Sequence, residues 1–557
     1  MRGPLTLGAV VVLVAVTFVA FRVVSAQANG CSGSVRLSIA ANPDIYPAVR
    51  EAAARWVDTN PKVDNDCIHM QVNPVPAADV ANALAVRAGG GALIDVAARP
   101  APTPADDEVP AVWIPDSVSW VGRVQAIRRD VFEYDVTSVA MSPVVLAMPE
   151  TLARTLSGGS SHKLTAEEFA GLLQRSLRDK EPNVQVGIAE PRRDAASLAG
   201  AVLMYDAVPT GPAQLPALIG AYRGISVVPD RAALLRVFDR SQAIAPVAEQ
   251  AILAPDAASQ RPPFTAVPLA AAIALDYPYA VVAGRPRAVA QAAAQFRAAL
   301  MSRGYRDILT KAGFHDPGRS ANQGLSIGDG GPANPVTGNS LADGKKITDV
   351  LAIWKSARTP SRIIAFTDVT AVMGQPAAPG ALTRLEIMQQ AQLDGLKLIT
   401  DDSEVGVWTF ASGLPGGKDY QEMVPVGPLD AVQRDRINLA VATNRPVATD
   451  SRGLYESVLA AYQVATDGWD ESRSNMVLVC TGGGNTKPGG LSLDGVRLEL
   501  EKLADPAKPI RLVVVGLGPD VNLDELATFA KTAGGKAFKA ERPEEIGEIF
   551  LRALLRG

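Results

Sequence analysis

An acidic and a hydroxyl side chain stand two residues apart after an apolar run, and this pair could hold a metal ion. The run spans residues 361–366, and Asp368 and Thr370 follow it. Carboxylate and hydroxyl oxygens are ligands that hard divalent cations such as Mg²⁺ accept. In a parallel α/β sheet such groups gather at the carboxyl ends of strands, where ligands bind. The stretch therefore predicts a cation site or the remnant of one.

The segments that must position this pair predict a doubly wound α/β domain over residues 346–557. Apolar strand-like runs alternate there with helical periodicity, which is the pattern of a mainly parallel sheet. Further strands are expected at 402–410, 475–480, 510–516 and 534–538, and helices at 347–357, 382–392, 453–462, 523–532 and 543–555. In this order, and above all in the phrase at 402–410, the region resembles bacterial von Willebrand factor A domains.

That resemblance implies a metal-ion-dependent adhesion site, of which this chain keeps only part. The family site uses Asp-x-Ser-x-Ser on one loop, a Thr on a second and an Asp on a third. Asp368 matches the first position, and Thr370 keeps a hydroxyl at the next. Val372, Arg452 and Gly482 stand where the resemblance implies Ser, Thr and Asp. Three of five ligands are missing, so we expect a vestigial site with no metal and no cofactor.

Arg452 suggests a replacement for the missing cation. A guanidinium at this ligand position could pair with Asp368 and preserve the loops without an ion. The competing interpretation is that Arg452 extends into solvent. A shift of the loops by a residue or more is a further alternative, in which Thr449, Asp450 or Thr481 would supply the missing ligands.

Residues 31–318 form a second predicted module, and strands alternate with helices at its start, over 35–96, which predicts a mainly parallel sheet. Strands are expected at 35–40, 68–72, 92–96, 142–149 and 184–188, and residues 112–120 are expected to be a strand that runs into a polar aromatic loop. A helix is expected at 164–173, a returning segment at 268–279 and a closing helical segment at 296–314. In this order the region resembles bacterial extracytoplasmic solute-binding proteins of the two-lobed class. The resemblance implies that the chain leaves a first lobe, builds a second, crosses back, and binds a ligand between them.

Six residues are the candidates for ligand binding that this resemblance implies. They supply loop hydroxyls, helix N-termini and an aromatic wall: Asn42, Ser117, Trp120, Ser142, Asp194 and Ser197. The competing interpretation is structural, because Asp194 and Ser197 can cap a helix and Trp120 can be a core residue. A small molecule or a peptide would fit the implied cleft, and the sequence does not choose between them.

Composition bounds the class of protein. The chain has 557 residues, 47% of them hydrophobic and 20% charged, as expected for several globular domains with large cores. Its formal net charge of −4 gives no electrostatic footprint for nucleic acid. Glycine, asparagine and proline enrich residues 319–345, which we interpret as a linker.

The first thirty residues predict export. Arg2 precedes an apolar run at 5–21, which is typical of a secretory signal or an N-terminal membrane helix. An extracytoplasmic location, anchored or secreted, permits a disulfide, and Cys31 with Cys67 is the natural pair. Cys31 as a lipid-attachment site is disfavoured because no large aliphatic residue precedes it closely. Cys480 lies in a strand-like run and is expected to be a small buried hydrophobe.

Signals for catalysis are sparse. His69, His162 and His315 have neither metal-ligand spacing nor a nucleophile beside them. The Gly-x-Ser-x-Gly pattern at 324–328 lies in the linker, without the strand and helix that a nucleophile elbow requires. No enzyme activity is expected.

The domain plan is therefore a signal or anchor at 1–30, a solute-binding-like module at 31–318, the linker, and an A domain at 346–557. We interpret the protein as a membrane-associated recognition protein whose A domain contacts an unknown protein partner without metal. The alternative is a substrate-binding receptor of a membrane transport system, with the A domain as a docking piece. An unrecognised enzyme is a third possibility, without residues to support it.

Overall fold

The chain divides into two compact units in the computed structural model, one comprising Met1–Ala207 with Ile225–Thr348 and the other Val208–Gly224 with Asp349–Gly557. The structure describes residues 30–91, 109–133, 136–156, 184–211, 214–228, 242–253, 264–268, 273–317, 340–377, 382–519 and 521–540, with Leu93, Leu234, Glu545 and Ile549. Several predicted segments lie wholly or mostly outside these residues: the N-terminal apolar segment, the strand at 92–96, the helix at 164–173, the linker and the terminal helix at 543–555.

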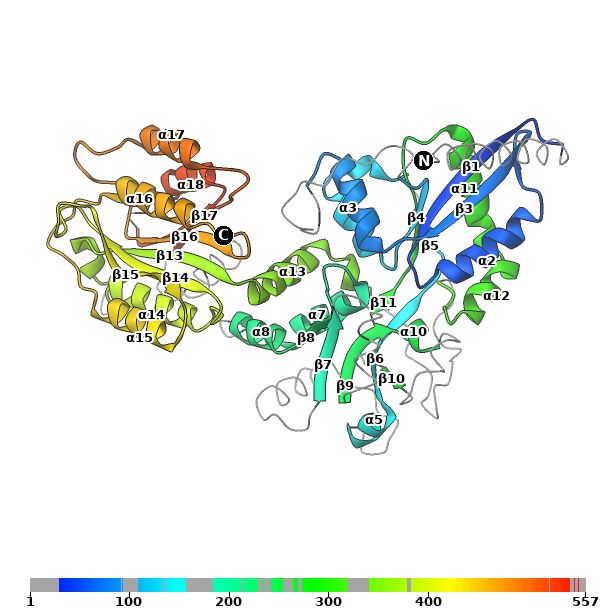
Figure 1. The fold of residues 1–557 in the computed structure, drawn as a ribbon, viewed down its shortest axis with the longest axis horizontal. Helices are drawn as coiled ribbons and strands as arrows, with labels where there is room; N and C mark the ends of the chain where they lie inside the picture. Colours follow the sequence, from blue (N-terminus) through cyan, green and yellow to red (C-terminus); the bar gives the residue numbers. More distant parts are fainter. Residues whose placement is uncertain are drawn as a thin grey trace, which may run out of the picture. The chain divides into compact units, whose positions relative to one another are not determined.

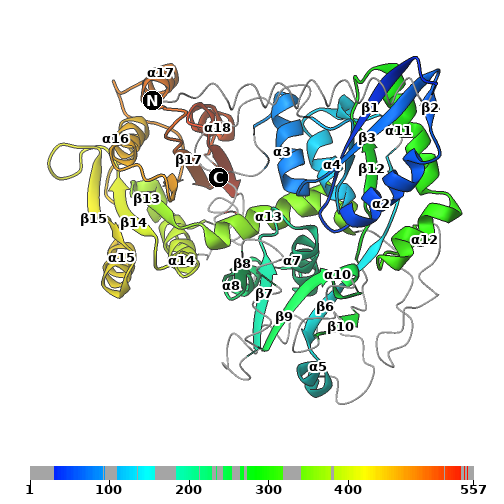
Figure 2. The same cartoon turned by 45° about the vertical axis from the view of Figure 1, so that its right-hand side comes forward.

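The first unit contains two sheets, each flanked by helices (Figures 1 and 2). The strand order of the first lobe is β2-β3-β1-β4-β12-β5. Its strands are β1 (Gly33–Ala41), β2 (Lys62–Val63), β3 (Asp66–Pro74), β4 (Val112–Ile114), β5 (Thr137–Ser138) and β12 (Pro278–Val281). Its helices are α2 (Tyr46–Val57), α3 (Ala77–Arg87), α4 (Val118–Gln125), α11 (Arg287–Leu300) and α12 (Arg303–Lys311). Because β1 runs parallel to β3 and β4, the loops that follow β1 and β4 lie at one edge of the sheet.

The second lobe is built around β6 (Ser142–Pro149), an apolar strand that is buried along its whole length. The strand order is β10-β6-β9-β7-β8, and β11 also pairs with β6. The other strands are β7 (Val184–Ala189), β8 (Ser226–Val228), β9 (Gln242–Ala248), β10 (Phe264–Pro268) and β11 (Ala274–Leu275), and the helices are α5 (Glu150–Leu156), α7 (Ala195–Ala207) and α10 (Glu249–Leu253). This sheet is mixed, because β6 pairs antiparallel with β9 and β10, whereas β7 runs parallel to β8 and β9.

The chain passes between the lobes twice, as the two-lobed prediction requires. The first passage follows β5 and the second precedes β12, and the two lie side by side because the Val139 amide donates to the Tyr277 carbonyl at 3.1 Å. The predicted closing helical segment is two helices, α11 and α12, which a short turn at Met301 separates.

The second unit is a six-stranded sheet in the order β15-β14-β13-β16-β17-β18, parallel except at its β15 edge. The strands are β13 (Ser361–Asp368), β14 (Glu404–Phe410), β15 (Tyr420–Pro428), β16 (Ser474–Thr481), β17 (Arg511–Leu517) and β18 (Lys536–Ala540). The helices are α13 (Gly344–Arg358), whose first residues belong to the first unit, and α14 (Arg384–Leu396), α15 (Ala431–Thr443), α16 (Leu454–Asp467), α17 (Leu493–Leu503) and α18 (Leu523–Thr532). Residues of α14 and α15 form a core on one face of the sheet, and residues of α16, α17 and α18 form a core on the other. The doubly wound fold is as predicted, whereas β15, α15 and α17 were not anticipated.

A segment from the middle of the chain is part of this second unit. Residues 208–224 include α8 (Gln214–Arg223), which packs on α13. The buried rings of Tyr222 and Trp354 meet edge to face with centroids 5.2 Å apart. Arg358 Nη1 donates to the Tyr222 carbonyl at 2.9 Å, and Arg223 Nε donates to the Ala357 carbonyl at 3.0 Å. The second unit therefore draws on sequence that lies far upstream of its sheet.

Truncating the α8 aromatic residue tests this membership. Tyr222→Ala removes a fully buried ring, so we expect the second unit to lose about 3–5 kcal/mol of stability. Leu439→Ala is the control, because Leu439 is 66% exposed on α15. The stability of both variants is measured by urea unfolding of the full chain, with hydrogen exchange of the β13 and β16 amides reporting on the second unit. Equal stability of the two variants would show that α8 is dispensable.

The predicted disulfide is present between Cys31 and Cys67, whose Cα atoms are 5.6 Å apart. It links the chain just before β1 to β3, the parallel neighbour of β1. Cys480 is a free, fully buried thiol in β16, and its burial raises its pKa to about 12. The third cysteine is therefore protonated and inaccessible in the folded protein, as the strand pattern predicted.

Thiol labelling should follow this arrangement. We expect no label on the native protein, two labelled cysteines after native reduction, and three after reduction and unfolding. Closing a loop of 36 residues contributes about 3–4 kcal/mol, so reduction should lower the stability of the first unit by that amount. Labelling of Cys31 or Cys67 before reduction would refute the disulfide.

Candidate functional site

Asp368 is the fully buried last residue of β13, and its carboxylate is surrounded by donors. Oδ1 accepts hydrogen bonds from the Thr370 amide at 2.8 Å and the Thr370 hydroxyl at 2.6 Å. Oδ2 accepts from the Gly482 amide at 3.0 Å. Thr481 Oγ1 lies 3.3 Å from Oδ2, although its shorter contact, 2.7 Å, is to the Gly483 carbonyl. The loops after β13 and β16 thus converge on one carboxylate.

Arg452, from the loop before α16, completes the surroundings of this carboxylate. Its Nε lies 2.7 Å from Asp368 Oδ2, and the two side chains are 7% and 0% exposed. The Nε–H bond is not aligned on the oxygen, so the contact is an ion pair rather than a directed hydrogen bond. Nη1 donates to the Gly484 carbonyl at 2.8 Å. The predicted ion pair is confirmed, and the alternative in which Arg452 extends into solvent is wrong.

The remaining loop residues make structural contacts. The Ser451 amide donates to Thr449 Oγ1 at 3.1 Å, and the Thr449 carbonyl accepts from the Ala371 amide at 2.9 Å. The Asp450 carbonyl accepts from the Thr486 hydroxyl, which itself accepts from the Arg452 amide at 2.8 Å. The arginine loop is therefore held by backbone contacts to its neighbours.

Neither the space nor the donor set fits a divalent cation. A Cβ atom on Gly482 would lie 2.8 Å from Met373 Sδ and 3.1 Å from Val372 Cγ1, so an aspartate has no room there. A Cβ on Gly483 would lie 2.6 Å from Arg452 Nη1. Mg²⁺ requires near-octahedral oxygen coordination, which a carboxylate already paired with a guanidinium does not supply. Among the residues that the structure describes, no three or more histidine, cysteine, aspartate or glutamate side chains are grouped to hold a metal.

A second polar layer fixes the loop after β16. Glu525 Oε1 accepts from the Asn485 amide at 3.0 Å and from the Tyr455 hydroxyl at 2.7 Å. Burial, followed by the hydrogen bond to Glu525, raises the pKa of Tyr455, which keeps its hydroxyl a donor. Lys487 Nζ lies 2.6 Å from Asp419 Oδ2, and this contact raises the pKa of the lysine.

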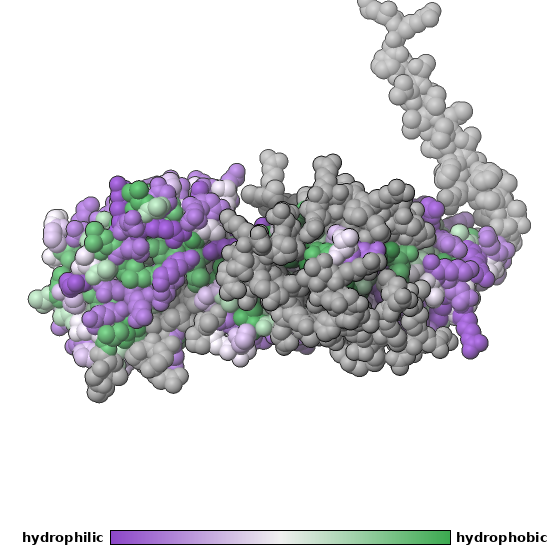
Figure 3. All heavy atoms as spheres, turned by 90° about the horizontal axis from the view of Figure 1, so that it is seen from below, coloured by the Kyte–Doolittle hydropathy of each residue, from purple (hydrophilic) through white to green (hydrophobic). Residues whose placement is uncertain are grey.

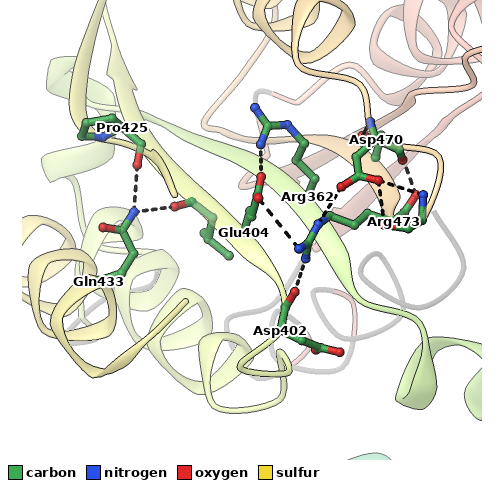
Figure 4. A network of polar contacts seen from close by, with 10 residues as sticks. Arg362, Asp402, Glu404, Pro425, Gln433, Asp470 and Arg473 are labelled. Atoms are coloured by element: carbon green, nitrogen blue, oxygen red, sulfur yellow. Dashed lines mark hydrogen bonds and ion pairs between the residues drawn. The ribbon is translucent and has the colours of Figure 1, made fainter. Parts of the chain in front are cut away.

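The opposite end of the sheet carries a separate ionic network (Figure 4). Glu404, at the start of β14, pairs with Arg362 of β13 and lies 3.8 Å from Arg473 Nη2. Arg473 Nε also lies 2.9 Å from Asp470 Oδ2. Gln433 Nε2 donates at 2.8 Å to the Pro425 carbonyl and so fastens α15 to β15. These contacts join strands at their amino ends, away from Asp368.

Removing the central arginine should be costly. Arg452→Ala leaves Asp368 buried without its counter-charge, so we expect a loss of about 3–5 kcal/mol in urea unfolding. Arg497→Ala is the matched control, because this exposed arginine lies 3.2 Å from Asp494 on α17, and an exposed pair contributes at most about 1 kcal/mol. Equal losses in the two variants would contradict a structural role for the buried pair.

The first-lobe ligand candidates lie in the loops after β1 and β4. Asn42 Oδ1 accepts from the Asp44 amide at 3.1 Å, and Ser117 caps α4 by accepting from the Ser119 amide at 3.1 Å. The Asn42 amide donates to the carbonyl of Ile114, so the two loops are neighbours. These contacts account for the local structure around both residues.

Trp120 is inside the first-lobe core rather than on an aromatic wall. Its side chain is fully buried, and Nε1 donates to Asp116 Oδ1 at 2.8 Å. The polar phrase around it continues as helix α4, so the ring points inward at helical spacing. The structural interpretation of Trp120 matches this position.

The second-lobe candidates surround the start of α7. Asp194 Oδ1 accepts from the Ser197 amide at 2.7 Å, and Ser197 Oγ accepts from the Ala189 amide at 3.0 Å. Ser142, at the passage between lobes, accepts from the Gln250 amide at 3.0 Å. The structure therefore brings Asp194 and Ser197 together, whereas Ser142 contacts α10 where the chain enters the second lobe. Roles in ligand binding stay predictions for all six candidates.

Three arginines between the lobes were not anticipated. Arg193 Nη2 pairs with Asp79 Oδ1 of α3 at 2.7 Å, and Arg123 Nη1 lies 3.4 Å from the Arg192 carbonyl. Burial, with repulsion from Arg192, lowers the pKa of Arg123 to about 10. The Arg-Arg-Asp phrase at 192–194 was the signal in the sequence for two of these arginines.

His315 was also missed as a contact of the inter-lobe passage. Its Nε2 lies 2.5 Å from Oε2 of the buried Glu249, the first residue of α10. The His315 backbone pairs with that of Met141 in both directions. These contacts attach the end of the first unit's closing helices to the second lobe.

Comparison with known proteins decides the family. The profile of the bacterial extracellular solute-binding proteins matches residues 37–315, half of the chain. The chain belongs to this solute-binding protein family. The solute-binding module is followed by the doubly wound unit, whose sequence pattern resembles that of von Willebrand factor A domains. Members of this family are extracellular solute-binding proteins, which are generally not enzymes.

Relatives cover most of this arrangement. Two uncharacterized proteins of Mycobacterium tuberculosis, from strains CDC 1551 and H37Rv, are each 26% identical over 591 residues, covering 96% of this chain and 80% of the relative. Among solved structures, a periplasmic thiamin binding protein has a TM-score of 0.41 at 10% identity, covering 58% of this chain and 96% of that one.

Two further solved structures are similar to parts of the chain. The sulfate-binding protein SubI from Mycobacterium tuberculosis H37Rv has a TM-score of 0.35 at 14% identity, covering 51% of this chain and 88% of that one. A von Willebrand factor type A protein from Catenulispora acidiphila has a TM-score of 0.29 at 15% identity, covering 35% and 42%. Across the described part of the chain, no helix is both long enough and apolar enough to span a bilayer.

Proposed function

We propose that the protein is an exported, non-enzymatic recognition protein whose A domain binds a protein partner without metal. The observation that carries this proposal is the buried pair of Arg452 and Asp368. A guanidinium replaces the cation's charge, and the loops after β13 and β16 keep their positions around the carboxylate. The partner contact then depends on the shape and polarity of the loop surface rather than on an ion.

The surface of the A domain suits a protein contact. Hydrophilic and hydrophobic residues interleave over the part of this domain visible in Figure 3. Val432 and Leu439 are 57% and 66% exposed on α15. Mixed surfaces of this kind are usual for non-obligate protein interfaces.

The solute-binding module would hold a small molecule or a peptide between its lobes. Membership of the family and the disulfide both support a location outside the cytoplasm. Attachment to the membrane through residues 1–30 is part of the proposal. The second candidate function is a substrate-binding receptor for a membrane transport system, which family membership alone favours. Co-purification of a small ligand, detected by native mass spectrometry, would support that alternative.

Partner capture with and without chelator tests the proposed function. The full chain carries an affinity tag and is used as bait in Mg²⁺ and, separately, in EDTA. We expect the same partner in both conditions with the wild-type chain and with Arg497→Ala, and its loss with Arg452→Ala. A partner that EDTA releases would contradict metal independence. If Arg452→Ala still captures the partner, partner recognition does not depend on the ion pair.

Metal titration gives an independent prediction. Because Arg452 already neutralises Asp368, adding Mg²⁺ or Mn²⁺ should give no saturable heat in calorimetry and no rise in melting temperature. Saturable binding at one site, lost in Asp368→Asn, would show that the loops rearrange to bind metal and would contradict the proposal.

A further inference from the structure

Helix α7 of the solute-binding module is buried on all sides. Its residues from Ala195 to Met204 are all buried, and they are almost entirely apolar. One side faces the sheet, since a Cβ on Gly200 would lie 2.6 Å from Pro246 Cγ of β9. Side chains two positions apart on a helix point to nearly opposite sides. Leu198 and Val202, each two positions from Gly200, therefore face away from β9. Both are at most 1% exposed, so something other than the sheet covers this outer side.

The chain's own return from the linker packs on α7. The short 3₁₀ turn η3 (Ser340–Ala342) lies against both α7 and α4. Leu341 is fully buried, whereas the residues that follow it, 342–345, are exposed. A single leucine side chain thus enters an apolar environment from an otherwise solvated segment.

Polar contacts hold this segment in place. Asp343 Oδ1 accepts from the Lys346 amide at 3.0 Å and so fixes the start of α13. Lys346 Nζ lies 2.9 Å from Asp206 Oδ1, near the end of α7. Figure 2 shows the first turn of α13 beside α7, and Ile347 of that turn is buried. The segment from Leu341 to Ile347 therefore lies along α7.

The position of η3 matters because α4 and α7 belong to different lobes. Helix α4 follows β4 of the first lobe, and α7 follows β7 of the second. A hydrogen bond also links the two helices, because Arg123 of α4 donates to the carbonyl of Arg192, which precedes α7. A segment packed against both helices occupies space between the lobes.

We propose that residues 340–342, anchored by Leu341, are an intramolecular occupant of the space between the lobes. The occupant is a peptide segment with an apolar anchor, and it holds α4 and α7 together without a free ligand. An external ligand would reach this space after Leu341 leaves it. This inference rests on the proposed ligand-binding role of the module and names the chemical class of its resident occupant.

Hydrogen exchange measured by mass spectrometry on the full chain tests this role. Leu341→Asp places a charge in the apolar site and should release the segment, so amides of α4 and α7 should exchange at least about tenfold faster. Protection in β13 and β16 of the A domain should not change. Leu498→Asp, a substitution of a 58% exposed leucine on α17, is the matched control and should leave α4 and α7 unchanged.

A milder variant keeps the test decisive. If Leu341→Asp also removes protection from β1 and β3, the comparison passes to Leu341→Ala, which should accelerate exchange in α4 and α7 alone. Unchanged exchange in α4 and α7 in the deciding variant would overturn the proposal. Partner capture tests a different surface, that of the A domain. If exchange in α4 and α7 accelerates but no partner is captured, the proposed function is contradicted and this inference stands.

Discussion

The second unit depends on one buried ion pair at the carboxyl ends of its central strands. Asp368 and Arg452 are almost entirely removed from solvent. Charges buried in this way are tolerated only when they are paired and hydrogen-bonded. Here the pairing draws in the amides of Thr370 and Gly482 and the carbonyl of Gly484. The side chain of Arg452 thus connects the loops after β13 and β16 with the loop before α16.

The pair also explains the small and apolar residues around it. Gly483 leaves space for the guanidinium, and Gly482 leaves space for Met373 and Val372. An acidic residue at 482 would face both a steric clash and a carboxylate that already has its counter-charge. The residues at 372, 452 and 482 therefore fit one another in both charge balance and packing.

The sequence predicted most of this unit because its signals are local. The buried strands are apolar runs with sharp ends. Arg452 could be placed because Leu454 and Tyr455 follow it at the spacing that the resemblance implies for the family's threonine ligand. Strand β15 and helix α15 were missed because their apolar residues do not mark one buried face. Most of β15 is exposed or half-buried, and in α15 Val432 and Leu439 are exposed whereas Ile437 is buried.

Contacts between segments that lie far apart in the sequence could not be predicted from the sequence. Tyr222 belongs to the second unit through its contact with Trp354, although the chain around it belongs to the solute-binding sequence. Leu341 stands at the end of a polar linker, and only the three-dimensional arrangement shows that it is buried against α7. Such packing depends on surfaces that separate segments form together. Among the ligand candidates, the helix cap at Asp194 followed from residue type and position, whereas the cap at Ser117 and the arginines between the lobes did not.

A double-mutant cycle on Asp368→Asn and Arg452→Gln, measured by urea unfolding in EDTA, tests the central claim most directly. If the arginine replaces the metal, the two substitutions should be coupled by about 2 kcal/mol or more, and Mg²⁺ should not change that value. Additive effects within about 0.5 kcal/mol, or a coupling that Mg²⁺ alters, would contradict the account.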